Sequence, residues 1–156
     1  MKKTVLYLLT LCLLGLSGCA KHEIIFDHPF IYITDKHEAM TSTINCMGST
    51  IEAYTVYFSS KMPNKDIEVY FDIVIGAGLV EGVDFNVLTP PSAPLTFPNG
   101  TFQREIRVQW FAHTVDRSKD NTLKIILTGN SENHTLGMPG PSQNFIHHTI
   151  TKILID

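Results

Sequence analysis

Residues 67–75 read Ile-Glu-Val-Tyr-Phe-Asp-Ile-Val-Ile, and this stretch decides the fold class. Every second side chain is apolar and most of those between are polar, which is the period of a β-strand with one buried face. Residues 102–111 repeat the pattern, with Trp110 on the same face as Ile106 and Val108. This shared face places the tryptophan in the core rather than on the surface as a binding platform.

Further strand-like runs cover residues 30–34, 49–60, 123–127 and 145–155, and turn residues separate them. The alternation of the last run changes phase near His148, which predicts a β-bulge or a shift of register. The sequence shows no amphipathic helix and no internal repeat. About seven strands at this spacing predict an all-β fold, a single antiparallel immunoglobulin-like sandwich.

The N-terminus has the organisation of a secretory signal peptide. Lys2 and Lys3 precede a largely apolar run from Val5 to Leu16. As a helix this run would span roughly 18 Å, which is too short for the ~30 Å hydrocarbon core of a bilayer. A basic start, a short apolar middle and a small-residue exit predict a signal peptide over residues 1–18.

The end of this segment, Leu16-Ser17-Gly18-Cys19, resembles the lipobox of bacterial lipoproteins. The resemblance implies cleavage before Cys19, a diacylglyceryl group on its thiol and acylation of its new amine. Two or more acyl chains anchor a protein stably to a bilayer, whereas one chain binds only marginally. The alternative is an ordinary secretory cleavage site that happens to contain a cysteine.

The chain after the cleavage site divides into a lipidated tether over residues 19–29 and a sandwich domain over residues 30–156. Ala20 stands where some lipoproteins carry the aspartate that retains them in the inner membrane. The lipid bilayer that holds Cys19 is therefore predicted to be the outer membrane. The cell surface and the periplasmic face both remain open.

The charge balance and the cysteine count limit the kinds of partner and of cross-link that this protein can have. Removal of the signal peptide leaves ten basic against fifteen acidic residues and no basic cluster, which argues against nucleic acid as a partner. Once Cys12 is removed and Cys19 carries lipid, Cys46 is the one cysteine left, so no internal disulfide can form. The hydrophobic core must hold the fold.

Two segments resemble the Calx-β type of immunoglobulin-like sandwich: Glu-Gly-Val-Asp-Phe at residues 81–85 and Leu-Thr-Phe-Pro-Asn-Gly at residues 95–100. The alternating strand at 102–111 and the ending Thr-Ile-Thr-Lys-Ile-Leu-Ile-Asp at 149–156 fit the same pattern. The likeness covers most of residues 30–156. Similar modules behind a lipobox occur among surface lipoproteins of gut-type bacteria, and many of those accompany glycan-uptake systems.

The same motifs have a structural explanation, because Gly82 and Gly100 would set backbone turns and the Asp84 carboxylate would cap one. Calx-β domains of ion exchangers bind calcium through carboxylates clustered at one end of the sandwich. The conceivable calcium ligands of this chain are Asp35, Asp84, Asp116 and Asp120. Arg117 and Lys119 lie between Asp116 and Asp120, and their positive charges oppose a cation in that segment. Calcium also takes about six to eight oxygen ligands, several of them carboxylates. The sequence therefore predicts no metal and no cofactor.

No metalloprotease, serine-hydrolase, thiol-redox or phosphate-loop motif occurs, so we expect no enzymatic activity. The main surface feature is the loop at residues 129–144, because loops of this length in compact domains tend to be functional or mobile. Its side chains able to hydrogen-bond sugar hydroxyls are Asn130, Asn133, His134, Gln143 and Asn144. The alternative is a flexible, solvated hairpin.

These observations support a membrane-anchored, non-catalytic binding module for a glycan or for a component of a glycan-uptake assembly. The alternative is a structural or adhesive envelope component, in a pilus or a cell-surface assembly, that accepts a partner strand at an exposed sheet edge.

Overall fold

The computed structural model describes residues 28–61 and 65–155, which form ten β-strands and no helix. The strands are β1 (Phe30–Thr34), β2 (Thr41–Asn45), β3 (Thr50–Ser59), β4 (Ile67–Ile75), β5 (Phe85–Val87), β6 (Leu95–Phe97), β7 (Gln103–Trp110), β8 (Thr122–Asn130), β9 (Thr135–Leu136) and β10 (His147–Ile153). No helix in these ranges is long and apolar enough to cross a bilayer. The lipobox, Cys19 and most of the tether lie outside the described residues.

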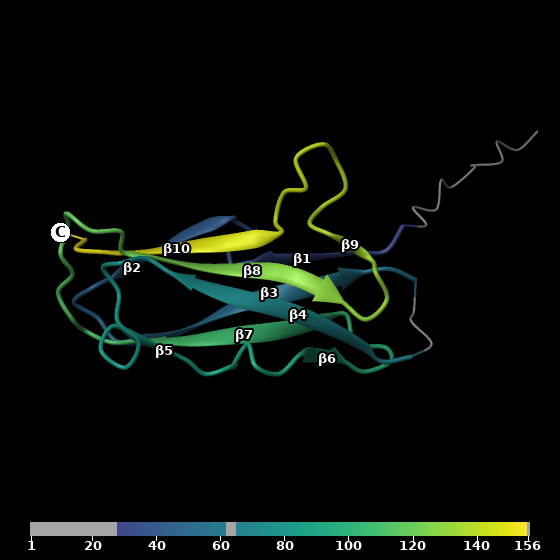
Figure 1. The fold of residues 1–156 in the computed structure, drawn as a ribbon, viewed down its shortest axis with the longest axis horizontal. Coiled ribbons are helices and arrows are strands. Elements are labelled where there is room, and N and C mark those ends of the chain that lie inside the picture. Colours follow the sequence, from purple (N-terminus) through teal and green to yellow (C-terminus); the bar gives the residue numbers. More distant parts are fainter. Residues whose placement is uncertain (1–27, 62–64, 156) are drawn as a thin grey trace, which may run out of the picture.

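The strands form two five-stranded sheets, in the orders β5-β7-β3-β1-β9 and β2-β10-β8-β4-β6 (Figure 1). The predicted all-β sandwich is confirmed, but its pairing is not antiparallel throughout, because β9 pairs parallel to β1 and β2 pairs parallel to β10. A parallel pair needs a long connection between its strands. The rest of the sandwich supplies that connection, since the partners in both pairs lie far apart in the sequence.

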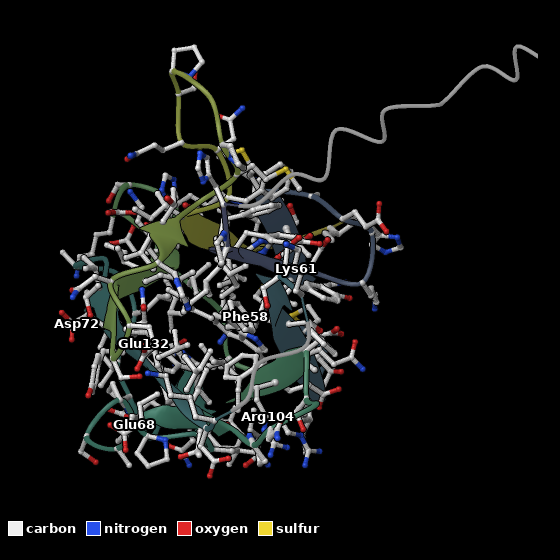
Figure 2. All side chains as sticks on the ribbon, turned by 90° about the vertical axis from the view of Figure 1, so that its right-hand side faces the viewer. Phe58, Lys61, Glu68, Asp72, Arg104 and Glu132 are labelled. Atoms are coloured by element: carbon white, nitrogen blue, oxygen red, sulfur yellow. The ribbon has the colours of Figure 1, made fainter. Side chains whose placement is uncertain are left out.

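The core lies between the two sheets. Figure 2, which views the sandwich end-on, shows Phe58 inside and the charged Glu68 and Arg104 at the periphery. Trp110 is completely buried, which confirms its predicted place in the core. The alternation in β4 is confirmed in its first half, whereas Ile75 at its end is 42% exposed.

The expected bulge near His148 is wrong. Strand β10 pairs with β8 in one continuous register, and its inward side chains are His148, Ile150 and Lys152. The alternation seemed to change phase because two of these three buried side chains are polar. The register shift lies instead between Tyr70 and Phe71 of β4, opposite β8.

The loop expected at residues 129–144 is also more ordered than predicted. Strand β8 continues to Asn130, and the short strand β9 pairs with the start of β1. Figure 1 shows the rest of the loop, between β9 and β10, standing out from the body of the sandwich. The strands missing from the sequence-based count are short ones such as β2 and β9, whose few residues carry little periodic signal.

Candidate ligand-binding site

An aromatic notch opens on the outer face of the first sheet, at the foot of the loop between β9 and β10. It has a volume of about 220 Å³ and is lined by Tyr32, Thr34, Glu38, Tyr57, Met138 and Phe145. The two tyrosines face outward because their neighbours on β1 and β3, Ile33 and Val56, face the core. The strand period thus places aromatic side chains on both faces of one sheet.

The floor of the notch is a cross-strand aromatic pair. Tyr32 lies directly opposite Tyr57 in the β1–β3 register, and their rings stack with centroids 5.1 Å apart. Phe30 extends the row, with its ring 5.7 Å from that of Tyr32. Cross-strand aromatic pairs of this kind stabilise a sheet and also present a flat apolar surface.

The wall of the notch comes from the loop. The Phe145 ring meets Tyr32 edge-on at 6.4 Å. The loop is fastened to β1 by two backbone hydrogen bonds, from Ile33 N–H to the Phe145 carbonyl (2.9 Å) and from Gly137 N–H to the Ile31 carbonyl (2.7 Å). These bonds hold the base of the loop against the sheet, whereas a freely solvated hairpin would make no such bonds.

Two residues of the notch adopt backbone conformations that residues other than glycine rarely take. Glu38 has φ 57° and Phe145 has φ 64°. For a bulky residue such as phenylalanine a positive φ is a genuine outlier, and such strain concentrates at binding and switch sites. Asp35 supports the first of these turns, because its Oδ1 accepts hydrogen bonds from the backbone N–H groups of His37 and Ala39, both at 2.9 Å.

The polar groups of the notch are two phenol hydroxyls, the Glu38 carboxylate and the Thr34 hydroxyl, which donates to backbone carbonyls of Asp35 and Ala39. Partial burial, together with the neighbouring Tyr57 and Glu38, raises the pKa of Tyr32 above its ordinary value. The Tyr32 hydroxyl is therefore protonated at neutral pH and can donate a hydrogen bond. The notch combines flat apolar rings with donors and an acceptor at its rim, which is the general composition of a small-ligand site.

Three of the predicted ligand-binding residues build a turn instead. The Asn130 side chain donates to the His134 carbonyl (2.9 Å) and accepts from the backbone N–H groups of Glu132 (3.1 Å) and His134 (2.9 Å). Asn133 takes a positive φ of 55° inside this turn. The His134 ring stacks on Phe58 at 5.3 Å, and burial lowers its pKa. The hydrogen-bonding capacity of Asn130 is thus used within the fold.

The other two predicted residues, Gln143 and Asn144, have exposed side chains and directly precede Phe145. Their backbone carbonyls pack against Gly137, where a side chain could not fit because Gln143 O would lie 2.5 Å from its Cβ. Sequence reasoning missed the aromatic residues of the notch. A signal was available, since Tyr32 and Tyr57 both fall on outward positions of their strands.

The four aspartates considered as calcium ligands are engaged elsewhere. Asp35 holds its own turn, and Asp84 is buried in an ion pair with Lys152. Asp116 accepts from Ser118 N–H (2.9 Å) and its hydroxyl (2.7 Å). Asp120 accepts from the backbone N–H and the hydroxyl of Thr122. Across residues 28–61 and 65–155, no three His, Cys, Asp or Glu side chains come together as a metal site.

A second cavity, of about 340 Å³, lies over β2 and is lined mainly by polar side chains. At its edge His148 Nδ1 lies 3.0 Å from the Ala39 carbonyl, and its Nε2 lies 2.9 Å from Ser42 Oγ. A carbonyl only accepts, so Nδ1 carries the proton and Nε2 accepts from the serine hydroxyl. The two carboxylates of this cavity do not converge, because Asp35 holds its turn and Glu52 pairs with Lys36 at 3.2 Å.

We expect the free energy of unfolding to fall as the pH drops below about 6.5, the ordinary histidine pKa. Burial lowers the pKa of His148, so the folded state binds fewer protons than the unfolded state in this range. The stability is present above that pH and is lost as His148 becomes protonated. Urea unfolding across the range measures the effect.

The variant His148→Gln should flatten this dependence, whereas His147→Gln, on the opposite face of β10, should retain it. Part of the slope will remain in His148→Gln, because burial also lowers the pKa of His134. A wild-type protein whose stability rises on acidification through this range would contradict the assignment of a neutral, buried His148.

A comparison with solved structures supports the fold. The chain is similar to the crystal structure of CBD12 from CALX1.2, a Calx-β structure, with a TM-score of 0.58 and 17% sequence identity. The match covers 80% of this chain and 44% of that one, so the chain spans less than half of its structural neighbour. No family model matches the sequence, and no curated protein matches it either.

The described domain is therefore a Calx-β-like sandwich. At this level of identity the likeness concerns the fold alone. It confirms the fold resemblance seen in residues 81–85 and 95–100. Gly82 and Gly100 have φ values of 83° and 82°, as the predicted turns require.

Proposed function

We propose that this protein is a lipid-anchored, non-catalytic binding module whose aromatic notch holds a glycan. The observation that carries the proposal is the stacked pair of Tyr32 and Tyr57, walled by Phe145 on a loop fastened to the sheet. Sugar rings have apolar C–H faces and polar edges. A site that combines flat aromatic rings with rim hydroxyls and a carboxylate matches both features.

The shape of the notch favours a short segment of a glycan rather than a long chain. Its volume of about 220 Å³ lies below the ~300–1,000 Å³ typical of pockets that enclose a drug-sized ligand. One or two sugar units would rest on the tyrosines, with Glu38 accepting from a hydroxyl. Gln143 and Asn144, exposed beside Phe145, would contact the units on either side.

The anchor belongs to the same proposal. Acyl chains on Cys19 would keep the module at the outer membrane, and β1, which carries Tyr32, is the first strand after the tether. A notch close to the anchor in the sequence suits a protein that holds a glycan near the membrane for uptake by other components.

We expect Tyr32→Ala to weaken glycan binding about tenfold or more, because it removes half of the stacking floor. The protein is first screened on a glycan array, and the affinity for the best oligosaccharide is then measured by calorimetry. Tyr70→Ala is the matched control, since Tyr70 is also a partly exposed tyrosine on a strand but lies on the other sheet and bonds to Glu68. Equal affinities for Tyr32→Ala and wild type would exclude the notch as the site.

The structural or adhesive alternative has its own support in β2, which ends its sheet with no further described strand beside it and exposes Thr41, Thr43 and Asn45. Such an edge can accept a strand from another protein. A protein that binds no glycan on the array but captures an envelope component, and loses it on Thr43→Pro, would favour this alternative.

A further inference from the structure

A lysine and an aspartate meet inside the sandwich. Lys152 is completely buried, and the Asp84 side chain is 2% exposed. Lys152 Nζ lies 2.8 Å from Asp84 Oδ1 and 3.3 Å from the Asp84 carbonyl oxygen. Lysines are almost never fully buried unless they are paired, and this one occupies an inward position of β10 that an aliphatic side chain would ordinarily fill.

The pair joins the two sheets. Lys152 belongs to β10, in one sheet, and Asp84 directly precedes β5, in the other. The two residues are far apart in the sequence, and within residues 28–61 and 65–155, where Cys46 is the one cysteine, no disulfide joins the sheets. A bond between these side chains would cross-link the sandwich near one end.

Both oxygens of the carboxylate have assigned partners. Oδ2 accepts a hydrogen bond from the Val80 backbone N–H at 2.9 Å. Oδ1 accepts from Lys152 and also lies 2.8 Å from His113 Nδ1, which must carry a proton because a carboxylate only accepts. The His113 side chain is 52% exposed, so it connects the buried pair to solvent.

We propose that Lys152 and Asp84 form an intramolecular isopeptide bond. The amine nitrogen and the carboxyl group are already in hydrogen-bond contact, and both side chains are buried. Reactants fixed at such a distance reach effective concentrations that no bimolecular reaction in water attains.

The chemistry balances with groups of this chain alone. Lys152 first passes a proton to Oδ1, which leaves a neutral amine beside a neutral carboxyl group. The nitrogen lone pair then attacks Cγ, and the negative charge that develops on Oδ2 is stabilised by the Val80 N–H. The extra proton on the former Lys152 Nζ is then transferred to the Oδ1 hydroxyl by way of the His113 imidazole, whose own charge is unchanged at the end. The Cγ–Oδ1 bond breaks, and the products are one amide and one water molecule.

Burial favours the neutral amide over two charges, although the hydrogen bonds to Asp84 stabilise its charged form. Burial alone would raise the pKa of Asp84, but hydrogen bonds from Lys152, His113 and Val80 outweigh it and hold that pKa below its ordinary value, so the carboxyl group starts as a carboxylate. Two charges buried in the sandwich have lost their hydration, whereas a neutral amide has much less to lose. Water formed at Oδ1 can leave along the exposed side of His113.

The test is a peptide map of the wild-type, full-length lipoprotein after denaturation. We expect a branched peptide that joins the segments containing residues 84 and 152 and is lighter than their sum by one water molecule. Trypsin should fail to cleave after Lys152, because acylation removes its charge. Linear peptides with a free Lys152 and a free Asp84 in the wild type would overturn the proposal, whatever the variants do.

Two variants test the assigned roles. Lys152→Met retains the volume but removes the nucleophile, and it should yield linear peptides only. His113→Ala should fold and yield a smaller cross-linked fraction soon after refolding, whereas His37→Ala, an exposed histidine far from the pair in sequence, should match the wild type. If His113→Ala cross-linked at the wild-type rate, His113 would have no part in the mechanism. The peptide map of the wild type would still decide whether the bond itself forms.

Discussion

Cys19→Ala is expected to move the protein from the membrane fraction to the soluble fraction. The substitution removes the thiol that the lipobox resemblance assigns to acylation. Each buried methylene contributes about 0.8 kcal/mol to membrane binding, and two chains anchor stably where one does not. Without these chains, the described domain offers no helix that could take their place in the bilayer. Fractionation followed by immunodetection measures the change.

The control for this experiment is Cys46→Ala. Cys46 is completely buried in the sandwich, so its thiol is inaccessible to a modifying enzyme in the folded protein. This variant should remain in the membrane fraction. A Cys19→Ala protein that still pellets with membranes after a high-salt wash would show that something other than acylation holds it there, and protease treatment of intact cells would then locate the domain.

Asp84→Ala is expected to lower the free energy of unfolding by about 3–5 kcal/mol, the loss typical when one partner of a buried ion pair is removed. The variant leaves the Lys152 ammonium in the core without its carboxylate, and it removes the acceptor of the Val80 N–H. The loss is expected whether or not the isopeptide bond forms, since both interactions need the Asp84 carboxyl group. Denaturant unfolding measures it.

Asp116→Ala is the matched control. Its carboxylate also accepts hydrogen bonds within a turn, but it is exposed and contacts Ser118 rather than a buried cation. The expected loss is below about 1 kcal/mol, as for other surface substitutions. If Asp84→Ala proved as mild as Asp116→Ala, Lys152 would have to reach solvent or lose its proton at little cost, and the buried pair would not be a main support of the fold.

The fold was predictable where alternation is strong. Strands β3, β4 and β7 are long and keep a period of two, so the alternation alone identifies their inward residues, such as Val56, Val69 and Trp110. The prediction failed where polar side chains occupy core positions. His148 and Lys152 on β10 disguised a regular strand as one with a bulge, because a pattern cannot show that a buried polar group has found its partner.

The site was harder to predict than the fold. Polar residues of the loop were expected to bind, yet the Asn130 side chain is used inside a turn. The notch depends on the register that sets Tyr32 opposite Tyr57, and on the loop path that brings Phe145 against them. Neither follows from local sequence, because register and loop path are set by contacts between segments distant in the chain.

The sequence by itself determined the all-β class, the position of the main strands and the expectation of a lipid anchor, because each of these follows from periodicity or from a short contiguous motif. Tertiary structure alone decided the parallel pairs at β2 and β9, the aromatic notch and the meeting of Lys152 with Asp84. The physical reason is that these features consist of contacts across the sandwich. Their free energy belongs to pairs of residues that the chain brings together only when it folds.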